Sequence, residues 1–65
     1  MRIYINQKVR ELGHPTHLVE LLNDIQPKKP FAIAVNNLFI PKDDYDNTLL
    51  HEEDHIEIIS PVTGG

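Results

Sequence analysis

Cysteine and tryptophan are absent from the 65-residue sequence, and glycine occurs only three times. The lack of cysteine excludes disulfides, thiolate metal ligands and a nucleophilic thiol, and it fits a reducing compartment. The sequence also lacks a long apolar run and a signal-peptide pattern. We therefore expect a cytoplasmic protein without a membrane span.

Charge and size narrow the possible functions further. Six basic residues stand against ten acidic ones, and the net charge of −4 argues against nucleic acid or an anionic membrane as a partner. A chain of 65 residues forms one small domain and cannot enclose the large cleft in which most enzymes exclude water. We therefore expect a protein that acts together with larger partners rather than an enzyme by itself.

The first half of the sequence predicts a hairpin followed by a helix. Apolar and polar residues alternate over residues 1–6, which indicates a half-buried strand. Asn6 and Gln7 suit a tight turn, and a short return strand over residues 8–12 follows. Thr16 is the expected N-cap of the helix. The apolar stripe of this helix has helical spacing and consists of Leu18, Leu21, Leu22 and Ile25.

The second half of the sequence predicts three strands. Residues 31–35 and 38–40 form a hairpin around Asn36 and Asn37, and residues 55–59 form the last strand. A polar loop over residues 42–48 lies between them, with Tyr45 as its expected anchor. The pattern of two strands, one helix and three strands predicts an α+β fold in which one helix packs on one sheet.

Residues 51–55 match the H-E-x-x-H pattern of zinc peptidases, in which a helix places both histidines on one face. Here the pattern lies in a polar stretch directly before a strand, and no third ligand is indicated. We therefore interpret it as a surface turn and predict no metal site. His14 and His17 have no further ligands nearby, and the carboxylates of residues 43–46 lack the spacing of a calcium loop.

The segment after Pro61 is a slender tail, which we expect to be flexible, and it consists of Val62, Thr63, Gly64 and Gly65. Together with Pro61, these make five residues, which span roughly 17 Å when extended, enough to thread a terminal carboxylate into the active site of a partner. Glycine suits such a passage because it has no Cβ to clash with the walls. The Gly65 carboxylate is ionised at neutral pH, so it can attack the α-phosphate of ATP and become an acyl-adenylate.

Taken in order, the motifs of the chain resemble those of the thiazole-biosynthesis sulfur carrier family, which is ThiS-like and has the ubiquitin-like β-grasp fold. The resemblance covers essentially the whole chain. Glu53 departs from the pattern, because the family usually has glycine there, and this departure concerns the turn geometry. The residues that carry the resemblance are Met1-Arg2-Ile3-Tyr4-Ile5-Asn6, Leu18-Val19-Glu20-Leu21-Leu22, Ala34-Val35-Asn36-Asn37, Ile40-Pro41-Lys42, Tyr45, Leu49-Leu50, Asp54, Ile56-Glu57-Ile58 and Pro61-Val62-Thr63-Gly64-Gly65.

The resemblance implies a β-grasp domain over residues 1–61, followed by a flexible Gly-Gly tail over residues 62–65. In the implied domain the sheet is mixed, the first and last strands are neighbours, and the helix packs across the sheet.

The resemblance also implies a role as a protein cosubstrate that carries sulfur for thiamin biosynthesis. An ATP-dependent adenylating enzyme would activate Gly65, and a persulfide-bearing sulfur donor would convert the adenylate to a thiocarboxylate. Thiazole synthase would then receive the sulfur. Val62, Thr63 and Gly64 would be the tail that binds the partners. No cofactor would be bound, because the adenylate and the thiocarboxylate are covalent intermediates.

Two kinds of alternative remain open. A molybdopterin-synthase small subunit or a ubiquitin-like protein modifier shares the fold and the Gly-Gly end, although such proteins usually run longer. A non-catalytic β-grasp interaction module would keep the fold with an idle tail. One residue appended after Gly65 separates these classes, because only a carrier would lose its activity.

Overall fold

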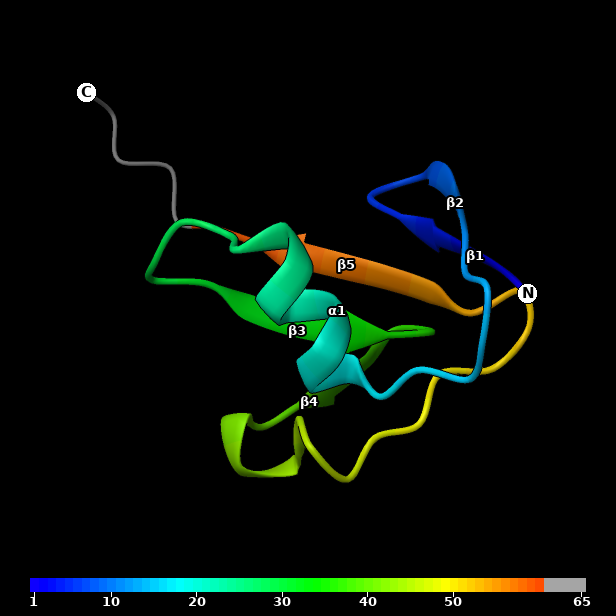
Figure 1. Cartoon of the computed structure of the whole chain (residues 1–65). Helices are drawn as coiled ribbons and strands as arrows, with labels where there is room; N and C mark the ends of the chain where they lie inside the picture. The colour runs from blue at the N-terminus through cyan, green and yellow to red at the C-terminus, as the bar shows by residue number, and fades with distance from the viewer. Residues whose placement is uncertain (61–65) are drawn as a thin grey trace.

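Five strands and one α-helix make up the computed structural model, which describes residues 1–60 (Figure 1). The expected tail at residues 62–65 lies outside the described residues. The elements are β1 (Arg2–Ile5), β2 (Lys8–Glu11), α1 (Leu18–Ile25), β3 (Ala32–Val35), β4 (Leu38–Ile40), a short 3-10 helix (Lys42–Asp44) and β5 (His55–Ile59). Their order confirms the predicted sequence of two strands, one helix and three strands.

The strands form one mixed sheet in the order β2-β1-β5-β3-β4. The first and last strands are parallel neighbours, with Tyr4 opposite His55 and Ile5 opposite Ile56. The other neighbouring pairs are antiparallel. This arrangement is the ubiquitin-like β-grasp, as the resemblance implied. It places β5, the strand that leads to the expected tail, at the centre of the sheet.

Both predicted hairpin turns are present, and asparagine explains their geometry. Asn6 and Gln7 have φ angles of 49° and 72°, and Asn36 and Asn37 have φ angles of 52° and 69°. Two successive residues with positive φ match the right-handed twist of the flanking strands, so they join two strands without splaying them. Asparagine tolerates this conformation better than most residues do. The local sequence is therefore sufficient to predict both turns.

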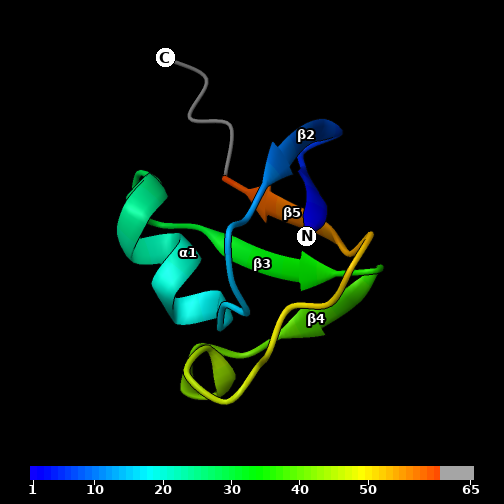
Figure 2. The ribbon, with the colours of Figure 1, turned by 45° about the vertical axis from the view of Figure 1, so that its right-hand side comes forward.

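The hydrophobic core lies between α1 and one face of the sheet (Figure 2). The helix contributes its predicted stripe, and each of the three central strands contributes an isoleucine that is almost fully buried. Tyr45 and Phe31 pack against the core and stack with their rings 6.5 Å apart, which confirms Tyr45 as an anchor of the polar loop. The buried hydrophobic cluster comprises Ile3, Leu18, Leu21, Leu22, Ile33, Ile40, Leu50 and Ile56.

The N-cap of α1 is His17 rather than the predicted Thr16. The Thr16 side chain is buried, and its hydroxyl donates to the His14 carbonyl instead of accepting from the helix. The free amides of the first turn find partners far along the chain: Leu18 and Val19 donate to the carbonyls of residues 48 and 45. Backbone carbonyls of the loop before β5 thus accept hydrogen bonds from first-turn amides, a role that a capping side chain often has in other helices.

No helix in the described part of the chain is long and apolar enough to cross a membrane.

Candidate functional site

The point at which β5 ends defines the candidate site, because the chain leaves the sheet there toward the expected tail. The last residue of β5, Ile59, is opposite Ala32 at the start of β3. On the β1 side the ladder ends earlier, with the pair of Ile5 and Ile56. The final residues of β5 therefore have a strand on one side only.

The side chain of Asn6 holds this unpaired side of β5. Its Oδ1 accepts a hydrogen bond of 2.9 Å from the Ile58 amide, and its Nδ2 lies 3.5 Å from the Ile58 carbonyl oxygen. The Asn6 amide also donates to the Ile56 carbonyl over 2.9 Å. The turn between β1 and β2 thus extends the parallel ladder with a side chain and fixes the position from which the chain leaves the sheet.

The face of the sheet away from α1 is open and carries exposed apolar side chains. Ile59 is 54 % exposed, Phe39 is 64 % exposed and Val9 is 59 % exposed. The registers place Phe39 beside Ala34, and Ala34 beside Glu57, so small side chains separate the larger ones. Because Ile59 is the last residue of β5, this open face is continuous with the end of the sheet where the expected tail begins.

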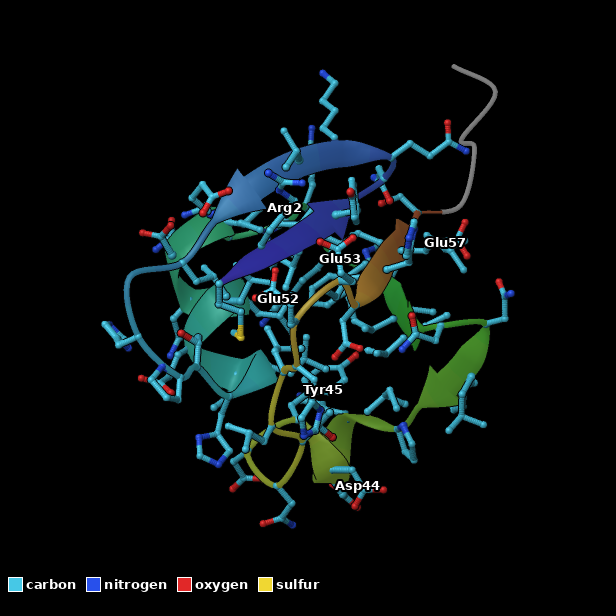
Figure 3. All side chains as sticks on the ribbon, turned by 90° about the vertical axis from the view of Figure 1, so that its right-hand side faces the viewer. Arg2, Asp44, Tyr45, Glu52, Glu53 and Glu57 are labelled. Atoms are coloured by element: carbon cyan, nitrogen blue, oxygen red, sulfur yellow. The ribbon has the colours of Figure 1, made fainter. Side chains whose placement is uncertain are left out.

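Acidic side chains border the open face along β1 and the turn before β5 (Figure 3). The Tyr4 hydroxyl donates to the Glu53 carboxylate over 3.2 Å, and the Tyr4 ring stacks on His55. Arg2 forms an ion pair of 3.4 Å with Glu11. The pKa of Arg2 is raised above its usual value by hydrogen bonding to Tyr4 and then to Glu11. Glu57 lies further along β5 in the same view (Figure 3).

A buried carboxylate organises the corner at which β5 begins. Asp54 accepts hydrogen bonds of 2.8 Å from the Asn36 side chain and of 2.8 Å from the His51 amide. Asn36 in turn accepts from the His55 amide over 2.9 Å. Because both oxygens of the buried carboxylate have donors, its desolvation is compensated. The corner sets the start of β5, as Asn6 sets its end.

Glu53 is the residue that departs from the family pattern, and it has a φ of 69°. This left-handed conformation suits glycine, because a side chain costs roughly 1 kcal/mol there. The turn nevertheless forms, with the Glu53 amide donating to the Arg2 carbonyl over 2.6 Å. The departure therefore leaves the turn geometry intact and adds a carboxylate beside Tyr4.

The H-E-x-x-H pattern does not lie on a helix. His51 is exposed in the turn, and His55 is the first residue of β5, where its ring stacks on Tyr4. The prediction of a turn before a strand is confirmed. Within residues 1–60, no group of three or more histidine, aspartate or glutamate side chains could hold a metal ion.

The predicted site residues Val62, Thr63, Gly64 and Gly65 lie outside the described residues. Sequence reasoning identified Asn6 only as a turn residue and missed its contact with Ile58, which is 52 residues away. The signal for the open face was present in the sequence, because alanine alternates with large apolar residues over residues 31–35. This alternation indicates which residues share a face, but not that the face stays uncovered.

The model of the ThiS family matches residues 3–65, nearly the whole chain. The chain therefore belongs to the ThiS family of small sulfur carrier proteins. No curated protein matches the sequence.

Solved structures share the fold at low sequence identity. The crystal structure of the thiamine biosynthesis protein (ThiS) from Geobacter metallireducens is 19 % identical, with a TM-score of 0.84 and full coverage of both chains. The solution structure of a thiamine biosynthesis protein from Geobacter metallireducens is also 19 % identical, with a TM-score of 0.79, and the match covers 100 % of this chain and 88 % of that one. At this identity the likeness concerns the fold.

Proposed function

We propose that the protein carries sulfur for the thiazole ring of thiamin, with the Gly65 carboxylate as the reacting group. The observation that carries this proposal is the family match, which extends over the Gly-Gly end to residue 65. The domain itself serves as a cosubstrate that larger enzymes recognise, and it supplies no catalytic group for the chemistry. The proposed domain spans residues 1–61, and the proposed tail spans residues 62–65.

In the proposed first step, an ATP-dependent adenylating enzyme binds the tail. An oxygen of the Gly65 carboxylate attacks the α-phosphorus of ATP, and pyrophosphate leaves. The product is an acyl-adenylate, in which a poor electrophile has gained a good leaving group. Val62, Thr63 and Gly64 occupy a passage in the enzyme. Because glycine has no side chain, the backbone at the end of the tail can approach the walls of this passage closely.

In the proposed second step, the terminal sulfur of a persulfide-bearing donor attacks the activated carbonyl carbon, and AMP leaves. The resulting acyl disulfide is cleaved by a thiol, which releases the thiocarboxylate of Gly65 and forms a disulfide on the donor side. Thiazole synthase then takes the sulfur. The absence of cysteine from the chain means that no internal thiol competes for the activated carbonyl.

The open face is the proposed docking surface for the adenylating enzyme. Ile59 and Phe39 are exposed there, and Ile59 is the last residue of the strand that leads to the tail. Asn6 holds the end of β5 beside the end of β1 through the Ile58 amide, so an enzyme that covers this face would find the end of β5 in a fixed position. Covering the exposed parts of these apolar side chains would favour association through the hydrophobic effect.

Intact mass spectrometry tests the proposal. The purified chain is incubated with ATP, a ThiS-type adenylating enzyme, a persulfide donor and a thiol. We expect the mass to increase by the difference between one sulfur and one oxygen atom. We expect this increase on the fragment that contains Gly65. A variant with one alanine appended after Gly65 serves as the control and is expected to show no increase. If sulfur is incorporated elsewhere, or if the extended variant reacts equally well, the proposal is wrong.

The acceptor is tested separately with the purified thiocarboxylate. We expect thiazole synthase to consume the thiocarboxylate. We expect the large subunit of molybdopterin synthase to leave it unchanged. Transfer to the molybdopterin precursor, or conjugation of Gly65 to protein lysines, would instead support the alternatives of a molybdopterin-synthase small subunit or a protein modifier. A chain that is folded but never adenylated would support an interaction module.

A further inference from the structure

A groove lies on the helix side of the sheet, away from the open face. It consists of two adjoining hollows of about 250 Å³ and about 320 Å³, which share Lys29, Phe31, Lys42 and Tyr45 as lining residues. The second hollow continues along the helix beside Val19. Because the hollows share so many residues, they form one groove between α1, the loop before β3 and the 3-10 helix.

The charge of this groove is opposite to that of the protein. The chain carries a net charge of −4, yet two lysines and no carboxylate of residues 1–60 line the groove. Arg2 and Arg10 are held by Glu11 and Asp24, whereas neither groove lysine forms an ion pair within the described part of the chain. Both lysine side chains are therefore available to an anionic ligand.

Apart from Asn23 and Gln26, the remainder of the groove is apolar, and part of it is rigid. Phe31 and Tyr45 stack with an interplanar angle of 11° and pack against the core, so their positions are fixed from below. Burial raises the pKa of the Tyr45 hydroxyl above its usual value. Pro27 and Pro30 line the walls, and proline has a restricted backbone. A preformed wall loses little conformational entropy when a ligand binds.

We propose that this groove docks a short acidic segment of a partner protein that carries an aromatic or large aliphatic side chain beside its carboxylates. The apolar side chain packs on Phe31 and Tyr45, while the carboxylates meet Lys29 and Lys42. The groove is open to solvent, which suits a peptide segment, because small molecules are usually bound in more enclosed cavities. The charge complementarity favours an acidic segment over a neutral one.

This inference is independent of the proposed sulfur chemistry. The groove and the open face lie on opposite faces of the sheet, since Phe31 precedes β3 on the side of Ile33 and the core. A partner in the groove therefore leaves Phe39 and the end of β5 accessible. Such an arrangement would let one protein retain the carrier while another enzyme processes Gly65.

Nuclear magnetic resonance titration of the full chain tests the proposal. The probe is an acetylated and amidated peptide with one phenylalanine flanked by glutamates. We expect saturable shifts of the amides of Phe31, Lys42 and Tyr45, with the amides of Tyr4 and Val9 unchanged. Substituting serine for the phenylalanine of the peptide, or glutamines for its glutamates, should weaken binding about tenfold or more, because each change removes one of the two contacts.

The double variant Lys29→Glu/Lys42→Glu is expected to bind the peptide about tenfold more weakly or worse, because two attractions become repulsions. Both lysines are exposed, so the variant keeps its fold, and an unchanged dispersion of the core resonances verifies this. Lys8→Glu is the matched control for Lys42→Glu alone, because each reverses one exposed lysine and Lys8 lies on β2 outside the groove. Equal weakening by this control would show unspecific charge attraction and overturn the proposal.

Two further measurements complete the test. ATP is titrated alone, and groove shifts at lower concentrations than the peptide requires would show a nucleotide site instead of a peptide site. The chain that lacks Gly65 is expected to bind the peptide unchanged while it forms no thiocarboxylate. The docking proposal and the sulfur-carrier proposal can therefore fail independently.

Discussion

On the helix side of the sheet, β1, β3 and β5 each place an isoleucine that is almost fully buried, whereas on the other side β4 and β5 leave Phe39 and Ile59 more than half exposed. The two faces have similar apolar residues but different coverings. Burial of an isoleucine contributes about 1.5–3 kcal/mol to folding, so the covered face holds the domain together. The open face contributes little to stability, and its apolar side chains are available for binding a partner.

The sharpest contrast between the faces is expected from truncating one residue on each. Ile56→Ala should lower the free energy of unfolding by about 3 kcal/mol, because it leaves a cavity beneath the helix. Phe39→Ala should change it by less than about 0.5 kcal/mol, because the ring is exposed. Urea denaturation measures both changes.

The same pair of variants also tests the proposed function of the open face. Phe39→Ala should slow adenylation of Gly65 while it leaves the fold intact. Equal loss of stability in the two variants would mean that the open face is part of the structural core. Normal adenylation of Phe39→Ala would place the enzyme contact elsewhere.

A smaller loss is expected at the corner where β5 begins. Asp54→Ala removes the acceptor for the Asn36 side chain and for the His51 amide. We expect the free energy of unfolding to fall by about 2 kcal/mol, because two donors near a buried position lose their partner. The exposed Asp43→Ala is the control and should lie close to the original protein in the same denaturation experiment. A neutral Asp54→Ala would contradict the organising role of this carboxylate.

A substitution in the turn before β5 is expected to raise the free energy of unfolding rather than lower it. Glu53→Gly should raise the free energy of unfolding by about 1 kcal/mol, since glycine accepts a φ of 69° without the side-chain penalty. Glu52→Gly is the control and should destabilise the protein, because Glu52 does not have a positive φ and its carboxylate accepts a hydrogen bond from the Arg2 amide, which glycine removes. Thermal melting distinguishes the two. A destabilised Glu53→Gly would mean that the contact with Tyr4 outweighs the backbone strain.

The smallest change in stability is expected from a substitution at the start of α1, and this change depends on pH. The pKa of Glu20 is lowered from 4.5, mainly because its carboxylate accepts a hydrogen bond from the His17 amide. A carboxyl group with a lowered pKa in the folded state stabilises the protein above pH 4.5, and this contribution disappears as the pH falls through the folded pKa. The original protein should therefore lose more stability on acidification than Glu20→Gln does. Parallel stability curves between pH 6 and pH 3 would contradict the role of Glu20.

The elements that were predicted correctly depend on neighbours in the sequence. Asn36 and Asn37 specify a turn because asparagine tolerates positive φ, and the period of the apolar residues distinguishes the helix from the strands. The N-cap was predicted at the wrong residue because the amides of Leu18 and Val19 are satisfied by carbonyls of the loop before β5. A capping rule that considers only neighbouring residues cannot predict acceptors that lie more than 25 residues away in the sequence.

The candidate functional residues also include some that the sequence predicts and others that only the tertiary structure brings together. The Gly-Gly end and its chemistry were recognisable from residue types alone, and they remain a proposal for residues 62–65. The groove at Lys29 and Lys42 could not be predicted, because residues on separate loops line it together. Its aromatic floor was visible only as two isolated residues in different segments.

The sequence by itself determined which residues turn, which alternate and which form the apolar stripe of α1, because steric preference and periodicity act over a few residues. It also determined that the chain has no thiol, so any sulfur it carries must be attached elsewhere than to a cysteine. Only the tertiary structure decided which face of the sheet stays uncovered and which side chain holds the end of β5. Those outcomes depend on contacts such as that of Asn6 with Ile58, which form when distant segments pack together.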